Sequence, residues 1–361
     1  MKSVRFIKFL FISLLLCCFS VHAEDSLKKI KVSLLLEHEA FLVWYGIEKG
    51  FDKEFGLDVA LSIKDVAGID LLNDKKVNPG AWDVASVGCV PAIVGSKGLE
   101  VSFVGIGNNE STSTEIMVRP DSDILKAKGT NPDYPEVYGS KETLVNKTIF
   151  IRKLTSAAYV LSNWLDLFGL TYADVKVVDG SLPDFLKYMK EGNGEAMILW
   201  SPSTFDAQSL GFKTAATADQ VDAMVPILFI ACSKFANENP QTLGRFLAMY
   251  DKVAKIQKKD PESLVSSYKN FLKIYSGRDY SEEFCLYDLK AHPVYTVDEQ
   301  IRLFDSDGNN LSAVEKLERH LISRMKLISM QPDAEYNPEE YKHNITSLFL
   351  KIAKRFIQEN K

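Results

Sequence analysis

Cysteine is scarce in this sequence, and its distribution excludes two kinds of cross-linked structure. Only five cysteines occur among 361 residues. Cys17 and Cys18 lie in an apolar N-terminal run, which leaves Cys89, Cys232 and Cys285 far apart and odd in number. Neither a disulfide framework nor a zinc site has this spacing, so we expect three unpaired and mostly buried thiols.

Common catalytic motifs are missing as well. No Gly-x-Ser-x-Gly elbow and no His-Glu-x-x-His segment occurs. The segment at 305–310, DSDGNN, begins like a calcium loop, but its glycine is misplaced and no glutamate follows at the twelfth position. We therefore expect no catalytic residue, no resident metal, no cofactor and no enzymatic activity.

The composition contains no excess of basic residues. The formal net charge is −5, the hydrophobic fraction is 46% and the charged fraction is 25%, which are ordinary values for a globular protein. Nucleic acid is therefore a poor candidate for a partner. The length is that of two domains of ordinary size.

The N-terminus has the layout of a cleaved signal peptide. Lys2, Arg5 and Lys8 precede the apolar run Phe9–Phe19, and Val-His-Ala precedes a polar stretch that starts at position 24. A membrane-spanning helix needs about 20 apolar residues, which this run does not supply. We expect cleavage of residues 1–23 and export of the rest.

Lipid anchoring is a second possibility for an exported protein. A lipoprotein signal places a small residue before the modified cysteine, but Leu16 precedes Cys17, and Cys17 precedes Cys18. The motif logic favours a soluble product over a lipid-anchored one. No later stretch approaches 18 uninterrupted apolar residues.

Short apolar runs alternate with helical patterns along the next 200 or so residues, an order that predicts an α/β fold with mostly parallel sheets. We expect strands at 29–36, 57–63, 82–87, 101–106, 148–151, 175–178, 196–200 and 227–232. The polar segment 121–147 reads as an irregular excursion at a lobe boundary. From residue 240 onward the pattern is mostly helical.

Four segments in this order resemble nitrate/sulfonate/taurine-type solute-binding proteins. They are Trp44–Ile63, Trp82–Gly105, Thr148–Val178 and Gly194–Phe212. The resemblance implies a two-lobed, type II periplasmic-binding fold with a helical C-terminal extension. We expect residues 24–118 to form the first part of the first lobe and residues 119–232 to form the second lobe. Residues 233–361 would return to the first lobe and form the extension.

The same resemblance implies a function. The protein would be the periplasmic component of an ABC importer, working as a monomer and delivering a small polar organic solute to a permease in the inner membrane. That solute would be a sulfonate, a carboxylate or an amino-acid-like compound. Two alternatives stay open: a pyrimidine-precursor binding protein or enzyme of thiamine biosynthesis, whose mid-chain cysteine cluster is missing here, and an extracytoplasmic sensory binding protein.

Ligands of parallel α/β sheets lie beyond the carboxyl ends of the strands, near helix N-termini. This rule selects the loops that follow the expected strands. The candidate ligand-binding residues are Glu37, His38, Ser86, Gly88, Asn108, Asn109, Arg152, Thr155, Ser156 and Trp200.

Thr155 and Ser156 open a helix, where a hydroxyl can cap the helix and free backbone N–H groups can hold an anion. Leu154 departs from the resemblance, because the family usually has a glycine there. Arg152 would pair with an acidic ligand or lie on a solvated strand face. Trp200 would form an apolar wall of the cleft or pack in the core.

Glutamates raise the question of ligand charge. Glu37, Glu39 and Glu110 follow or adjoin expected strands, although exposure at the surface is the usual situation of glutamate. If one of them faces the cleft, the ligand would be zwitterionic or cationic. The sequence leaves this choice open.

Overall fold

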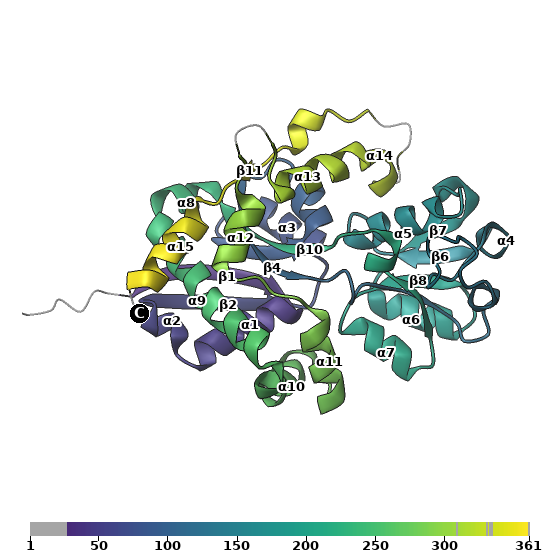
Figure 1. Cartoon of the computed structure of the whole chain (residues 1–361), viewed down its shortest axis with the longest axis horizontal. Helices are drawn as coiled ribbons and strands as arrows, with labels where there is room; N and C mark the ends of the chain where they lie inside the picture. The colour runs from purple at the N-terminus through teal and green to yellow at the C-terminus, as the bar shows by residue number, and fades with distance from the viewer. Residues whose placement is uncertain (1–26, 308–309, 330, 332–334, 360–361) are drawn as a thin grey trace, which may run out of the picture.

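The computed structural model describes residues 27–307, 310–329, 331 and 335–359. The expected signal peptide, residues 1–23, lies outside these residues. The described chain forms two lobes, each a sheet with helices on its faces (Figure 1). The predicted α/β, two-lobed class is confirmed.

The first sheet has six strands, in the order β11-β4-β10-β3-β1-β2. Their bounds are Asn344–Ile345, Val101–Asn109, Pro226–Cys232, Val84–Gly88, Lys28–Leu35 and Leu57–Lys64. All neighbours are parallel except around β10, which is antiparallel to both β3 and β4. Leu34, Phe103 and Phe229 are fully buried and form part of the core beneath the helices.

The second sheet has five strands, in the order β7-β6-β8-β5-β9. Their bounds are Lys176–Asp179, Thr148–Ile151, Ala196–Leu199, Glu115–Val118 and Lys213–Thr217. β5 is antiparallel to both β8 and β9, whereas β6 is parallel to its neighbours. Each lobe therefore has a mixed sheet with one strand of reversed direction.

The two reversed strands correct the expected lobe boundaries. The sequence pattern assigns 24–118 to the first lobe and 119–232 to the second, but β5 at Glu115–Val118 pairs in the second sheet and β10 at Pro226–Cys232 pairs in the first. Each is the first strand after the chain changes lobes, and the irregular segment 121–147 lies inside the second lobe. Strand alternation is a local signal, and it does not tell which sheet a buried strand joins.

Helices cover both faces of each sheet. In the first lobe these are α1 (His38–Glu48), α2 (Phe51–Glu54), α3 (Gly68–Val77), the π-helical turn Pro91–Gly95, α8 (Ser233–Glu238) and α9 (Pro240–Lys259). In the second they are α4 (Lys141–Leu144), α5 (Ser156–Asp166), α6 (Leu182–Lys190) and α7 (Ser203–Ser209). α1 and α2 are separated at Gly50, whose φ of 71° is left-handed and ends α1.

The C-terminal extension consists of helices that contact both lobes. It comprises α10 (Val265–Ser276), α11 (Glu282–Ala291), α12 (Val297–Phe304), α13 (Ala313–Ser323), α14 (Met325–Ile328) and α15 (Leu348–Glu359). Figure 1 shows α14 beside α5 and α11 beside α7, where Arg324 pairs with Asp166 and the Phe205 and Phe284 ring centroids are 3.7 Å apart.

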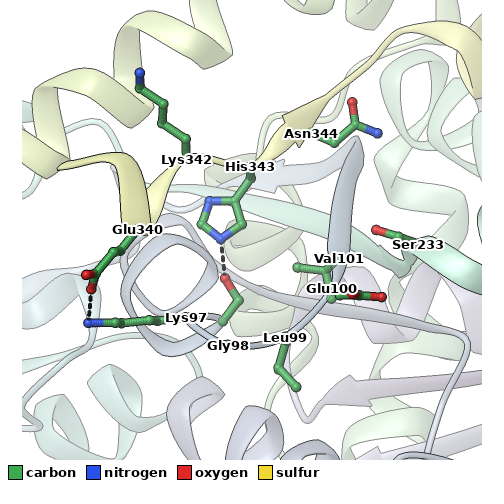
Figure 2. A pocket seen from close by; sticks show the side chains of 11 residues that line it. Lys97, Gly98, Leu99, Glu100, Val101, Ser233, Glu340, Lys342, His343 and Asn344 are labelled. Carbon is green, nitrogen blue, oxygen red and sulfur yellow. Dashed lines mark hydrogen bonds and ion pairs between the residues drawn. The ribbon is translucent and has the colours of Figure 1, made fainter. Parts of the chain in front are cut away.

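The end of the extension is fastened to the first lobe. The ring of His343 stacks on Phe103 at 4.6 Å, its Nδ1 lies 2.9 Å from Glu318 Oε1, and its Nε2 lies 2.6 Å from Ser96 Oγ. Figure 2 shows His343 pointing toward the loop that carries Lys97. These contacts hold the end of the extension against the first lobe.

Candidate functional site

Two adjoining cavities lie where the lobes meet. An inner cavity of about 20 Å³ is lined from the first lobe by Leu35, Glu37, Gly68, Gly88, Pro91, Glu110, Thr114 and Ile227, and from the second by Thr155, Ser156 and Trp200. An outer pocket of about 520 Å³ also has Glu37 and Trp200 in its wall. Residues of both lobes therefore enclose one two-part site.

The second lobe presents the start of α5 to the inner cavity. Thr155 is the N-cap, and its Oγ1 accepts a hydrogen bond from the Ala157 backbone N–H at 3.3 Å and donates to the Arg152 carbonyl at 2.7 Å. The expected cap is confirmed. Across the cavity, a Cβ on Gly88 would lie 2.9 Å from Ser156 Oγ, so the lobes approach closely here because Gly88 has no side chain.

Leu154 occupies an unusual backbone conformation just before this helix. Its φ is 58°, in the left-handed region that glycine adopts without strain. The departure from the family's glycine is thus accommodated in the same kind of turn, at a steric cost that leucine bears and glycine does not.

Arg152 is occupied by a protein carboxylate. Its Nη2 donates to Asp70 Oδ1 at 2.9 Å and Oδ2 at 3.2 Å, and its Nη1 lies 3.6 Å from Asp179 Oδ1. Asp70 belongs to the first lobe and Arg152 to the second, so this pair joins the lobes at the rim of the outer pocket. A ligand anion would have to compete with both aspartates for Arg152.

Three buried glutamates cluster at the inner cavity: Glu37 and Glu110 line it, and Glu39 lies behind them. The side chains of Glu37, Glu39 and Glu110 are 7%, 0% and 4% exposed. One carboxyl oxygen from each lies within 4.8 Å of the others. The expectation that these glutamates lie at the surface is therefore wrong for all three. The ends of β1 and β4 and the start of α1 place them beneath the second lobe.

Glu39 is held from behind by two of the candidate residues, Ser86 and Asn108. Ser86 Oγ donates to its Oε1 at 2.5 Å, and Asn108 Nδ2 approaches its Oε2 at 3.4 Å. Asn108 Nδ2 also lies 3.2 Å from His38 Nδ1, and His38 Nε2 lies 2.9 Å from Gln257 Oε1. His38, Ser86 and Asn108 are thus in a buried layer behind the cavity and do not form its lining.

Asn109 shapes the crossing between the lobes. Its Oδ1 accepts hydrogen bonds from the Ser111 backbone N–H at 3.1 Å and from Ser111 Oγ at 2.6 Å. Ser111 Oγ in turn accepts from the Val225 N–H at 2.9 Å, which ties the two crossing segments together. Asn109 therefore has a structural role beside the site.

His292 comes from the C-terminal extension and was not predicted. Its ring stacks on His38 with centroids 4.6 Å apart, and its Nε2 lies 2.9 Å from Ser113 Oγ and 3.9 Å from Glu110 Oε1. His292 Nδ1 lies 2.8 Å from the Asp288 carbonyl oxygen. The extension thus completes the buried polar layer beneath Glu110.

The inner cavity is acidic, and its lining within the described residues includes no Lys or Arg. Burial raises the pKa of Glu37 and Glu110 well above the usual value, and repulsion between neighbouring carboxyls adds to this rise. Burial also raises the pKa of Glu39 to about 7, although its hydrogen bonds oppose the rise. Burial, followed by repulsion from His292, lowers the pKa of His38 well below its usual value.

Several residues that line the two cavities are not among the ligand-binding candidates predicted from the sequence. Glu110, Thr114, Gly68 and Pro91 line the inner cavity, and Asp65 lines the outer pocket. The polar segment at 107–114, GNNESTST, follows an apolar strand and was the available signal. The sequence indicates Glu110 only as a glutamate that could pair with a cationic ligand. Its burial is not predictable from the sequence, because it depends on contacts between distant segments.

A second hollow, of about 300 Å³, lies between the first lobe and the end of the extension, away from the cleft (Figure 2). Beside it runs the hydrogen-bonded series Ser96, His343 and Glu318, which matches a hydrolase triad in residue type. Ser96 is fully buried, however, and its Oγ donates to the Ala92 carbonyl oxygen. We therefore assign this trio to fastening the extension.

Sequence comparison finds related curated proteins, while no family model matches the chain. A protein of Brachyspira hyodysenteriae named as an ABC transporter periplasmic binding protein is 22% identical over 298 residues, 82% of this chain and 85% of the relative. A Bacillus subtilis protein named as an aliphatic sulfonates-binding protein is 24% identical over 190 residues, 52% of this chain and 53% of the relative.

Solved structures share the fold. The periplasmic aliphatic sulphonate binding protein SsuA from Escherichia coli superposes with a TM-score of 0.66 at 14% identity, over 88% of this chain and 93% of SsuA. A mutant of DSZB, solved in complex with biphenyl-2-sulfinic acid, has a TM-score of 0.56 at 12% identity, over 91% of this chain and 99% of DSZB. A shared fold alone does not choose between binding and catalysis.

None of the helices within the described ranges is long and apolar enough to cross a bilayer. The relative from Brachyspira hyodysenteriae is named as a periplasmic protein. The resemblance expected from the four sequence segments is confirmed: this chain has the fold of SsuA-type solute-binding proteins, and its curated relatives are named as ABC transporter periplasmic and sulfonate-binding proteins.

Proposed function

We propose that this protein is the periplasmic solute-binding component of an ABC importer. It captures a small polar organic solute between its lobes and delivers that solute to a permease in the inner membrane, acting as a monomer after cleavage of its signal peptide. The observation that carries the proposal is the two-part cleft, whose inner cavity is lined by both lobes. The names and folds of the relatives support the same role.

Binding without turnover fits the chemistry around the cavity. Cys89 follows Gly88 and is fully buried, and burial raises the pKa of its thiol to about 12. The thiolate is the reactive form of cysteine, and its fraction near neutral pH is very small at such a pKa. Cys89 is therefore suited to packing beneath the cleft and not to nucleophilic attack.

The lobes must separate for a solute to enter the cleft, and the contacts between them oppose this opening. In the described structure Arg152 and Asp70 join the lobes on one side of the outer pocket, and Arg278 and Asp206 form an ion pair between the extension and α7. Both pairs are partly exposed to water, so each adds only a modest barrier to opening. The cleft can therefore hold a solute and release it.

A thermal-shift screen of organic anions, cations, amino acids and neutral heterocycles tests the proposal. A ligand present at a hundred times its Kd should add about 2.7 kcal/mol to the free energy of unfolding. The bound compound should be recovered unchanged by mass spectrometry after prolonged incubation. Conversion of the compound would contradict a binding protein and support an enzyme of the same fold.

A further inference from the structure

The inner cavity has a deficit of positive charge. Glu37, Glu39 and Glu110 bring three carboxyls together, and no Lys or Arg forms an ion pair with any of them in the part of the chain that the structure describes. Among the described residues, the only ionisable basic group within 4 Å of these carboxyl oxygens is His292, whose Nε2 lies 3.9 Å from Glu110 Oε1. Buried carboxylates are stable only when something pairs with them, so an ionised cluster calls for a cation from outside the chain.

Unpartnered atoms show where that cation would sit. Glu37 Oε2, Glu110 Oε1 and Thr114 Oγ1 are buried and have no hydrogen-bond partner among the described residues. All three side chains line the inner cavity and are at most 7% exposed. Buried polar atoms are nearly always hydrogen-bonded, so three together in one cavity indicate a missing partner.

A partner that stabilises these carboxyls in their ionised form must donate hydrogen bonds to them. Ionised carboxylates only accept them, and Thr114 can do either. A sulfonate or carboxylate offers no N–H or O–H to these acceptors and would be repelled by ionised glutamates. Glu39 is the fixed member of the group, because Ser86 and Asn108 already occupy its oxygens. The free oxygens of Glu37 and Glu110 therefore define the donor's position.

The size and walls of the site favour an organic cation over a bare metal ion. The inner cavity of about 20 Å³ admits a group the size of one water molecule, such as an ammonium or one end of an amidinium. The outer pocket of about 520 Å³ begins at the same Glu37 and Trp200 and includes apolar Leu36, Val66 and Leu182. An indole face is a favourable wall for an organic cation.

We propose that the inner cavity binds the protonated amine or amidine group of a small organic cation, whose apolar body occupies the outer pocket. Glu37 and Glu110 accept its N–H groups, Thr114 adds a third polar contact, and Trp200 covers the entrance. This inference rests on the proposed function, and it narrows the small polar organic solute to an organic cation.

Matched probes of equal shape test the charge preference. Calorimetry with the mature chain would compare benzamidinium, benzamide and benzenesulfonate, and also butylammonium and butanesulfonate, at pH 7.5. We expect saturable binding of at least one cation, with an affinity at least tenfold higher than that of its matched sulfonate. Binding should release protons, since a cation favours the ionised form of Glu37 and Glu110.

Glutamine substitutions test the assignment to these two side chains. Glu110→Gln and Glu37→Gln keep the shape of the side chain and remove its charge, so each should weaken cation binding at least tenfold. Glu340→Gln is the matched control, because Glu340 is exposed, pairs with Lys97 and lies outside the cleft. If one variant fails to fold, the other and the proton release of the wild type still decide the assignment.

The outcomes separate the inference from the proposed function. Tighter binding of a sulfonate than of its matched cation would overturn the cation site and leave a solute-binding protein. Binding of Ca²⁺ or Zn²⁺ alone, with no organic cation bound, would overturn the organic head group. Unchanged cation affinity in both glutamine variants would overturn the residue assignment. Consumption of a probe would instead contradict the proposed function.

Discussion

Arg152 of the second lobe donates two hydrogen bonds to Asp70 of the first lobe, at 2.9 and 3.2 Å. The two side chains are 29% and 41% exposed, so water and salt screen the pair. This contact can exist only when the lobes are close together. The Arg152–Asp70 pair therefore stabilises the closed arrangement of the lobes, and salt should weaken this stabilisation.

Asp70→Asn should speed the release of bound solute. A partly exposed pair contributes about 0.2–1 kcal/mol, so we expect up to about a fivefold rise in Kd, mostly through the dissociation rate. Stopped-flow displacement at low and high salt measures this. Asp58→Asn is the control, since Asp58 pairs with Lys53 within the first lobe. An equal effect of both substitutions would contradict a role for Asp70 in closure.

Gly88→Ala should hinder closure of the lobes. The added Cβ would lie 2.9 Å from Ser156 Oγ, and overpacking of this kind costs about 1–3 kcal/mol when neighbours cannot move. Affinity should fall about 5- to 150-fold by calorimetry, with little change in the unfolding free energy of the empty protein. Adding Ser156→Ala should restore part of the affinity, and the absence of any rescue would locate the clash elsewhere.

Leu154 should respond unequally to two substitutions. Leu154→Ile places a β-branched residue at a φ of 58° and should destabilise the protein by about 1–2 kcal/mol. Leu154→Gly removes that strain but adds chain entropy to the unfolded state, so we expect a change below about 1 kcal/mol. Urea unfolding measures both. Equal losses would show that side-chain packing, and not the backbone, dominates at this position.

Stability should fall as the pH rises from about 4.5 toward 7. The pKa of Glu39 rises from 4.5 in the unfolded chain to about 7 in the fold, so the folded protein holds this proton more tightly. The resulting stabilisation is complete below the unfolded pKa and is lost as the pH passes through the folded pKa, a change on the order of 3 kcal/mol. The burial-raised pKa values of Glu37 and Glu110 act in the same direction.

Thermal melts of the empty protein from pH 4.5 to 8 test this. Glu39→Gln keeps an acceptor for Ser86 and should flatten the profile, whereas Glu262→Gln, an exposed glutamate paired with Lys290, should leave it unchanged. A wild-type profile that rises between pH 5 and 7 would contradict buried, proton-holding carboxyls. Ligand cations should reduce the slope, since they stabilise the ionised form.

His343→Ala should loosen the C-terminal extension. The substitution removes the ring that lies between Ser96 Oγ and Glu318 Oε1, and of the two His343 hydrogen bonds to Glu318 Oε1 only that of the backbone N–H, at 3.0 Å, remains. Loss of a hydrogen bond at a buried polar group costs about 1–3 kcal/mol. Hydrogen exchange of β11 and α15 should rise in the variant, and Lys342→Ala, an exposed neighbour, is the control. Unchanged exchange would contradict a fastening role.

Local patterns in the sequence predicted most of the elements and some of the site. The strand at Thr148–Ile151, the cap at Thr155 and the unpaired state of Cys89, Cys232 and Cys285 are as expected. These features depend on neighbouring residues: apolar runs form strands, a threonine hydroxyl reaches the next turn, and widely spaced cysteines do not meet. The two-lobed fold followed from the order of such segments.

Tertiary structure alone decided the lobe of β5 and β10 and the charge of the cleft. Strand partners are set by long-range pairing, which no local alternation encodes. Glu37, Glu39 and Glu110 are buried because strand ends, a helix start and the second lobe converge on them, while in sequence they resemble surface glutamates. Burial and mutual repulsion then set their pKa values, and both depend on distances that only the folded chain creates.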